Sequence, residues 1–431
     1  MRKEITRVLK AAAVCVLAGL AGAQDTAQPQ SSSAEDRATI LQLVRQVSQL
    51  EAKVAALEGK TSAAPSPTTP PETPAINSES TDDSVAQMTA FRESHDLRGI
   101  HWRGFGEVAY KVLDQRQPEL GTFGFVPGSA GNFYTGDFEL FLTSKLTEKA
   151  SVLAEVVVGE GDGQSFSVEL GRALLKYDHN DHLRLSAGRY HTGIGYYNTA
   201  FHSGRWLQTT VDRPLVMEFA ADGGLLPTQA IGLSVNGQIS SGRLGLNYIA
   251  EYGSSDTIRP DLDGVGSLDE NNGNHFNLGL FARPESIPGL QVGASYYHDR
   301  ISDFAKGPSV RLGQTIVNGH VVYVAHNFEI LNEAFLIREA YENTGSVFNM
   351  PAFYTQFSRR FGKVRPYARY QYVNLNQNSL YHGDALLRHG PSFGVRYDFT
   401  DSVAFKTQFD HTIRTGKPNL NGLRFQLAFA F

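Results

Sequence analysis

The 431-residue chain has one cysteine and no strong charge of either sign, with 39 basic and 44 acidic residues. A single cysteine, Cys15, cannot form an intrachain disulfide or supply a thiolate metal cluster. The net charge of −5 gives no basic field for nucleic acid, so a nucleic-acid partner is excluded. No segment reaches the ~20 consecutive apolar residues of a transmembrane helix. Any membrane insertion must therefore use a closed barrel of strands.

Residues 1–23 have the pattern of a secretory signal peptide. Arg2 and Lys3 give a positive start, and 11–23 is an apolar, small-residue run that ends in an A-x-A cleavage site. The run is too short to span a bilayer as a helix. Cys15 lies inside it, and a lipid anchor is the alternative interpretation. We expect an exported chain that has lost this segment and its only thiol.

The next part of the chain predicts a helix between two irregular segments. Residues 24–35 are rich in Gln, Ser and Ala, and are expected to form a disordered N-terminus. From Ile40 to Leu57, apolar residues recur at spacings of three and four, which predicts a coiled-coil helix over 36–60. A helix this short is marginal alone, so it needs partners or, alternatively, lies on the barrel as an amphipathic helix. Residues 61–98 form a Pro/Ser/Thr-rich linker.

From residue 99 to 431 the hydrophobic period becomes two. In the first predicted strand, for example, Trp102 alternates with Arg103. About sixteen such segments are joined alternately by short connections, as at 400–401, and long ones, as at 253–273, which is typical of outer-membrane barrels. A soluble sandwich has no reason to separate loop lengths in this way. The predicted fold class is all-β: a transmembrane antiparallel β-barrel of about 16 strands, preceded by a short coiled-coil helix.

The last segment carries a family resemblance. Its alternate apolar residues end in Phe431, which resembles the C-terminal assembly signal of bacterial outer-membrane proteins. With the signal peptide and the loop pattern, residues 99–431 resemble the sixteen-stranded trimeric porins. The coiled coil before the barrel resembles that of the dicarboxylate-type and phosphate-selective porin relatives. The resemblance implies a bacterial outer-membrane location with the N-terminal helix in the periplasm, a homotrimer held through barrel and coiled coil, and outer-membrane lipid and small solutes as partners.

The longest connection, near 189–228, is a candidate constriction loop. In the porins that the chain resembles, the third external loop folds into the lumen and narrows it. The resemblance therefore implies that residues 189–228 constrict the pore here. A long loop can also serve as a surface lid or a trimer contact, which is the alternative.

Strand parity predicts which charged side chains face the lumen. The basic candidates are Arg103, Lys111, Arg172, Lys176, Arg184, Arg243, Arg365, Arg369, Arg396 and Arg424. The acidic candidates are Glu107, Asp137, Glu139, Glu155, Glu251, Asp398 and Asp410. The residues expected at the pore lining and constriction are Arg103, Arg189, His191, Arg205, Arg213, Glu218, Arg365, Arg369, Arg396 and Arg424. Charge in a narrow pore sets ion preference, so the excess of bases predicts a weak preference for anions. The alternative is a lumen of mixed charge with little selectivity.

The predicted function is a passive diffusion channel for small hydrophilic solutes, without catalytic residues, cofactor or metal. The histidines show no close paired spacing, and the acidic cluster at 261–270 lacks the spacing of an EF-hand. No nucleophile-elbow motif supports a barrel lipase, the enzymatic alternative. A further alternative is an envelope tether, in which the helix binds the cell wall or another envelope protein and the barrel is mainly a membrane anchor.

Overall fold

The computed structural model describes residues 99–114, 131–160, 166–201, 204–218, 225–254, 257–258, 265–266, 273–303, 310–379 and 386–431. The predicted signal peptide, N-terminal disorder, coiled coil and linker, residues 1–98, lie outside the described residues. So does the acidic cluster at 261–270, apart from the backbone of 265–266. Among the helices of the described residues, none has the length and apolar character needed to cross a membrane.

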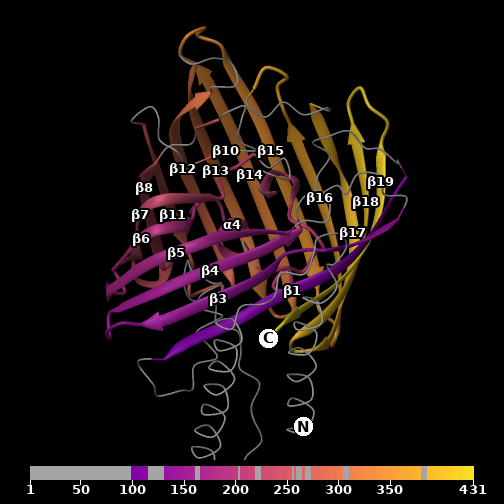
Figure 1. Cartoon of the computed structure of the whole chain (residues 1–431), viewed down its shortest axis with the longest axis horizontal. Helices are drawn as coiled ribbons and strands as arrows, with labels where there is room; N and C mark the ends of the chain where they lie inside the picture. Colours follow the sequence, from indigo (N-terminus) through magenta and orange to yellow (C-terminus); the bar gives the residue numbers. More distant parts are fainter. Residues whose placement is uncertain are drawn as a thin grey trace, which may run out of the picture. The chain divides into compact units, whose positions relative to one another are not determined.

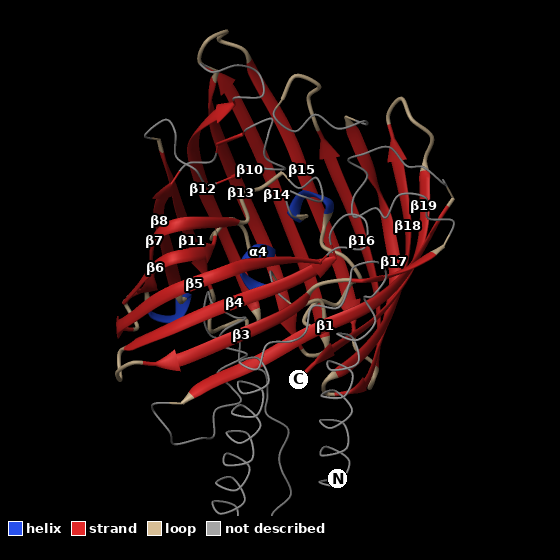
Figure 2. Cartoon of the chain, in the orientation of Figure 1, coloured by secondary structure: helices blue, strands red, loops and turns tan. Residues whose placement is uncertain are grey.

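Strands dominate the described part of the chain (Figures 1 and 2). The first ten are β1 (Ile100–Leu113), β2 (Asn132–Thr135), β3 (Phe138–Lys145), β4 (Ala150–Glu160), β5 (Phe166–Asn180), β6 (Leu183–His191), β7 (Gln229–Ile239), β8 (Leu246–Ser254), β9 (Thr257–Ile258) and β10 (Val265–Gly266). The others are β11 (Asn274–Ala282), β12 (Leu290–Asp303), β13 (Arg311–Ala325), β14 (Phe328–Tyr341), β15 (Val347–Arg359), β16 (Val364–Asn374), β17 (Leu387–Thr400), β18 (Val403–Arg414) and β19 (Leu420–Ala430). Within the described stretches, three short helices accompany them: α4 (Tyr197–Ala200), η2 (Leu215–Met217) and η4 (Gly242–Leu244).

The strands form one closed antiparallel barrel. β2 and β3 both pair with β1 and act as one interrupted strand, and β9 and β10 form a small hairpin between β8 and β11, which leaves sixteen barrel strands. β1 closes the ring on β19, from Phe105 opposite Ala430 to Leu113 opposite Gly422. Closure pairs the edges of the sheet, as a lipid-embedded backbone requires. The predicted fold class and strand number are confirmed for the barrel.

Side chains alternate between the two faces of the wall. On β13, for example, Gln314 and Asn318 point inward and are buried, whereas Val317 and Val321 point outward and are exposed. The same alternation on β16 buries Arg369 and exposes Tyr370. Apolar side chains therefore cover the outer face, and polar side chains are concentrated on the inner face, which is the arrangement expected of a barrel surrounded by lipid.

The connections differ in length at the two ends of the barrel. At one end they are tight, as at His326 and Asn327, whose φ angles of 51° and 68° are those of a two-residue hairpin turn. At the other end they are longer, and the longest joins β6 to β7 over 192–228. This loop is shorter than predicted, because β6 continues to His191.

One strand starts later than its alternating pattern predicts. The alternation predicts a strand over 242–252, but β8 begins at Leu246. Gly242, the first residue of helix η4, and Gly245, which follows the helix, both take positive φ angles. Arg243 consequently lies in an exposed turn, 3.8 Å from Glu285, and does not face the lumen.

The last residue packs on the outer face beside β1. The Phe431 ring lies against Phe138, with 5.4 Å between ring centroids, and against Trp102 at 6.0 Å. A Cβ atom on Gly104 would come within 2.1 Å of this ring, so glycine leaves the space that the terminal phenylalanine fills. The C-terminal pattern thus contributes to the seam that closes the barrel.

Candidate functional site within the lumen

The inner wall carries opposite charges on different strands. β16 to β19 present inward bases, whereas β14 presents inward acids. The bases of β16 to β19 are Arg365, Arg369, Arg388, Arg396, Lys406, Arg414 and Arg424, with Asp398 and Asp410 among them, and the acids of β14 are Glu329, Glu333 and Glu339. Both groups are largely buried, which requires compensating partners. The connection between β6 and β7, hereafter the inner loop (192–228), supplies most of them.

The inner loop is first held by acids of the wall. Both carboxylate oxygens of Glu251 on β8 accept from the backbone N–H of Gly193, each at 3.0 Å. Glu333 on β14 accepts from the backbone N–H groups of Tyr196 and Tyr197, at 2.6 and 2.9 Å. Those two N–H groups lie at the start of helix α4, where a helix leaves its donors without internal partners. The wall carboxylate satisfies them and fixes where α4 begins.

Apolar packing then fixes the same part of the loop to β14 and β15. Ile194, Tyr197 and Met217 of the loop form one buried cluster with Phe335 and Met350 of the wall. Apolar side chains on the inside of a barrel are unexpected if it encloses only water. Here they form a core between loop and wall, and its burial stabilises the loop in the lumen.

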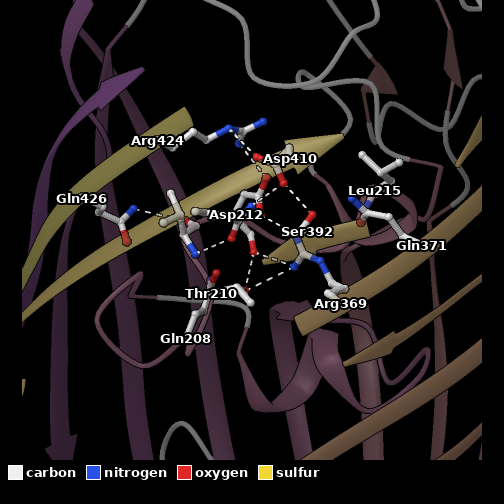
Figure 3. A network of polar contacts seen from close by, with 12 residues as sticks. Gln208, Thr210, Asp212, Leu215, Arg369, Gln371, Ser392, Asp410, Arg424 and Gln426 are labelled. Atoms are coloured by element: carbon white, nitrogen blue, oxygen red, sulfur yellow. Dashed lines mark hydrogen bonds and ion pairs between the residues drawn. The ribbon is translucent and has the colours of Figure 1, made fainter. Parts of the chain in front are cut away.

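Further along, Asp212 is the centre of a charged cluster (Figure 3). Its carboxylate binds the guanidinium of Arg369, accepts from Arg424 at 2.6 Å, and accepts from the Gln408 amide at 2.8 Å. We call these four residues the Asp212 clamp. They come from the inner loop and from β16, β18 and β19. Charge-assisted hydrogen bonds of this kind are stronger than neutral ones, so the clamp ties three strands to one loop residue.

The electrostatics of the clamp favour the ionised carboxylate. Asp212 belongs to the loop and lies outside the strands that span the membrane. Burial alone would raise its pKa, but Arg424 and Arg369, with the Gln408 hydrogen bond, outweigh burial and lower the pKa well below its usual range. The carboxylate is therefore charged at neutral pH and balances the two buried guanidiniums.

Two more wall cations hold the loop by its backbone. Arg396 donates to the carbonyl oxygens of Trp206 and Gln208 at 2.7 and 2.9 Å. Lys406 donates to the carbonyl oxygens of Arg205 and Thr210 at 2.5 and 3.0 Å. These carbonyls lie outside regular secondary structure and gain charged donors from the wall. The basic strands thus act as a docking surface for the loop.

The other residues predicted within the loop have different surroundings. Arg213 is fully buried and donates to the carbonyl oxygens of Met217 and Phe201 and to the side chain of Asn198. It therefore connects separate parts of the inner loop to one another. The Arg205 guanidinium lies 3.7 Å from Glu107 on β1. Glu218 is buried close to the end of the described stretch 204–218.

The remaining predicted residues lie at several places on the wall. The Arg365 side chain is 23% exposed and donates to Thr209 of the loop at 3.2 Å. Arg103 stacks over the rings of Phe105 and Trp206, at 5.3 and 5.9 Å from their centroids. Arg189 lies apart from this group, at an outward position near the end of β6, where it binds Glu169 of β5.

His191 borders a cavity on the opposite part of the wall. Its Nε2 atom lies 3.5 Å from Glu155, which also accepts from Arg172 at 2.5 Å. The cavity lies between β5 to β8 and the inner loop, and it is lined by Arg172, Leu174, Ser186, Tyr190, His191, Thr199, Ser234, Asn236, Ile249 and Glu251. Space inside the barrel thus remains on the side away from the clamp.

Sequence reasoning missed Lys406, Glu329 and Glu333 as site residues. Each falls on the inward parity of a strand that was predicted, so the alternation itself could have identified them. Among the described residues, no group of three or more His, Cys, Asp and Glu side chains is placed to hold a metal ion.

No protein-family model matches the chain, and no curated protein sequence matches it. Solved protein structures, in contrast, do match the chain in fold. The anion-selective porin from Comamonas acidovorans is similar over 77% of this chain and 99% of its own, with a TM-score of 0.55 and 10% identity. The outer membrane channel DcaP of Acinetobacter baumannii is similar over 79% and 99%, with a TM-score of 0.53 and 11% identity. The trimer form of OmpT, an outer membrane protein of Vibrio cholerae, is similar over 78% and 100%, with a TM-score of 0.52 and 12% identity. At these identities the likeness establishes the fold: the described barrel has the architecture of bacterial outer-membrane porins.

Proposed function

We propose that the chain is an outer-membrane porin, a passive channel for small hydrophilic solutes with a weak preference for anions, and not an enzyme. The observation that carries the proposal is a closed barrel with a polar inner wall and an inner loop tied to that wall by Glu251, Glu333 and the Asp212 clamp. A barrel that served only as an anchor has no need of such a loop. The neighbours in fold from Comamonas acidovorans and Acinetobacter baumannii, a porin and a channel, support the same assignment.

The inner loop is proposed as the constriction. It crosses from β8 past β14 to β19 and narrows the lumen from the side of β14 to β19. The pore would then run between the loop and β5 to β8, where the cavity near His191 lies. In this arrangement Arg369 and Arg213 hold the loop, while the partly exposed Arg103, Arg205 and Arg365 contribute to the field in the pore.

The proposed anion preference rests on the sign of the charges around the loop. Inward bases outnumber inward acids on β16 to β19, and Asp212 neutralises only part of them. A net positive lining raises the local concentration of anions. The anion-selective porin from Comamonas acidovorans shares the fold, which supports this preference.

Conductance of the purified full-length protein in planar bilayers tests the function. We expect discrete, ohmic channel openings, and a reversal potential in a KCl gradient that has the sign of an anion-preferring pore. A protein that inserts into the bilayer but never conducts would overturn the proposal. Absence of lipid hydrolysis by the same preparation separates the channel from a barrel lipase.

The assembly is proposed as a homotrimer in the outer membrane. The region before the barrel is proposed to consist of the signal peptide 1–23, a disordered stretch at 24–35, a periplasmic coiled coil at 36–60 and a linker at 61–98. The trimer form of a fold neighbour supports the oligomeric state.

An envelope tether remains the second candidate, because the heptad seam of 36–60 is not needed for conduction. Deleting residues 36–60 distinguishes the two roles. Unchanged conductance with loss of envelope attachment would assign the helix to tethering, whereas loss of the trimer would assign it to assembly.

A further inference from the structure

Charge is rare on the outward face of the barrel strands. At the outward positions whose side chains the structure describes, the charged residues are Arg189, Arg300, Arg311, Arg338 and Arg359. All five are basic. Three of them lie on the adjacent strands β12, β13 and β14, near the ends that lead into long connections. A charged side chain facing lipid is unfavourable unless it has a polar partner, so this concentration requires an explanation.

Strand register brings the three arginines close together on the outer face. Arg300 pairs with Gly313, which is two residues from Arg311 on the same strand and the same face. Arg338 pairs with Thr315 on the next rung. From strand spacings, the three Cα atoms lie within roughly 15 Å of one another, close enough for long side chains to converge. A Cβ atom on Gly313 would have only the His298 ring within 4 Å, at 3.6 Å, so the centre of this group is open.

The group carries net positive charge. Glu342 accepts two hydrogen bonds from Arg300, at 2.6 and 2.7 Å, and balances that residue. Arg311 and Arg338 are exposed, and the Arg311 guanidinium lies close enough to Glu342 to interact with the same carboxylate. Among the described side chains, one carboxylate therefore faces three guanidiniums. We call Arg300, Arg311 and Arg338 the outer arginine patch.

The wall next to the patch is apolar. On the rung below Arg338, Tyr296, Val317 and Leu336 pair across the three strands and are 41%, 46% and 44% exposed. The rung after that has only small residues at its outward positions, namely Ala294, Gly319 and Ala334. A cationic group at the rim, above an apolar strip of wall with small residues in it, matches a molecule with an anionic head and hydrocarbon chains.

We propose that the outer arginine patch binds the phosphate groups of a phosphorylated glycolipid in the external leaflet of the membrane, with the acyl chains along β12 to β14. Guanidinium groups match phosphate in charge and in planar hydrogen-bond geometry. A second copy of the barrel is a poorer partner. None of the outward strand positions whose side chains are described carries a carboxylate that could pair with the patch.

The test is lipid binding to the purified full-length protein, followed by native mass spectrometry in detergent. The probes are bis-phosphorylated lipid A and the same lipid without its phosphates. The variant is the triple change Arg300→Gln, Arg311→Gln and Arg338→Gln. The matched control is Arg243→Gln with Arg359→Gln, two basic residues that lie at the opposite end of the barrel.

We expect the wild type and the control to retain the phosphorylated lipid and the triple variant to bind it roughly tenfold or more weakly, since each basic residue at a membrane surface contributes about 1 kcal/mol. The dephosphorylated lipid should bind all three proteins equally weakly. Equal binding of the phosphorylated lipid to wild type and triple variant would overturn the proposal. So would a triple variant that changes its oligomeric state while its lipid affinity is unchanged, because the face would then be a contact between copies.

If the triple variant folds poorly, as judged by its heat-modifiable migration in gels, a salt titration of the wild type replaces it. Phosphate recognition predicts that retention of the phosphorylated lipid falls as ionic strength rises. Retention that is independent of salt would also overturn the proposal. None of these readouts depends on conductance, so they stand apart from the porin assignment.

Discussion

At the residue scale, Asp212 connects the charges of the wall to the position of the loop. Two buried guanidiniums, those of Arg369 and Arg424, share its single carboxylate. Arg424 is also held by Asp410, at 3.2 Å, and Arg369 by the carbonyl oxygen of Asp212 itself, at 3.0 Å. Removing the carboxylate would leave both cations buried without their main anion, which is strongly unfavourable.

We therefore expect Asp212→Asn to release part of the inner loop. The free energy that holds the loop should fall by about 3 kcal/mol, the usual scale for breaking a buried ion pair. Single-channel recordings should show larger current noise and a higher open conductance. The control is Asp181→Asn, which removes the partner of an exposed pair with Arg184. Identical traces for Asp212→Asn and the control would show that the clamp does not position the loop.

The sequence determines which residues face inward better than it determines what they contact. A period of two was enough to assign Arg365, Arg369 and Gln371 to one face of β16, because a strand alternates its side chains regardless of their partners. The contact between Asp212 and Arg369 joins residues 157 positions apart, and the loop has no period that would indicate its path. That part of the site follows from barrel closure and from the apolar cluster around Tyr197.

At the element scale, close backbone approach decides where two strands can pair. Gly232 on β7 pairs with Gly253 on β8, and a Cβ atom on Gly232 would lie 2.2 Å from the carbonyl oxygen of Tyr252. Both glycines point into the barrel, next to Glu251, which begins the attachment of the inner loop. The strands must therefore move apart to accept any side chain here, because the obstacle is backbone.

We expect Gly232→Ala to reduce the yield of folded barrel and to lower its unfolding temperature. The control is Gly319→Ala on β13, where an added Cβ has nothing within 4 Å. Heat-modifiable gel migration measures the folded fraction of both variants. Equal folded fractions would mean that the wall adjusts at β7 and β8 without penalty.

Helix η4 shows why one strand boundary could not be found from alternation alone. Residues 242–252 continue the alternating pattern through Arg243 and Leu244, yet the glycines on either side take left-handed angles. Only the geometry of the turn between β7 and β8 requires this, and hydrophobic alternation carries no information about φ.

At the scale of the whole molecule, the inner loop divides the wall cations into two classes. Arg369 has no exposed side-chain surface and serves the clamp, whereas Arg365 is 23% exposed and lies 3.8 Å from Glu329. Charge reversal at Arg369 should disturb the loop and change ion preference together. Reversal at Arg365 should act mainly on the field within the pore, because its contact with the loop is a single hydrogen bond to Thr209.

We expect Arg365→Glu to shift the reversal potential in a salt gradient toward that of a cation-preferring channel, with little change in current noise. Arg369→Glu should give the same shift together with the noise expected of Asp212→Asn. Arg359→Glu is the control, because Arg359 faces outward and stacks on Phe328 and Phe361. An unchanged reversal potential for Arg365→Glu would remove this residue from the pore lining and leave selectivity to the opposite wall. His191 and Arg172 border the remaining space there, and they would be the next residues to reverse.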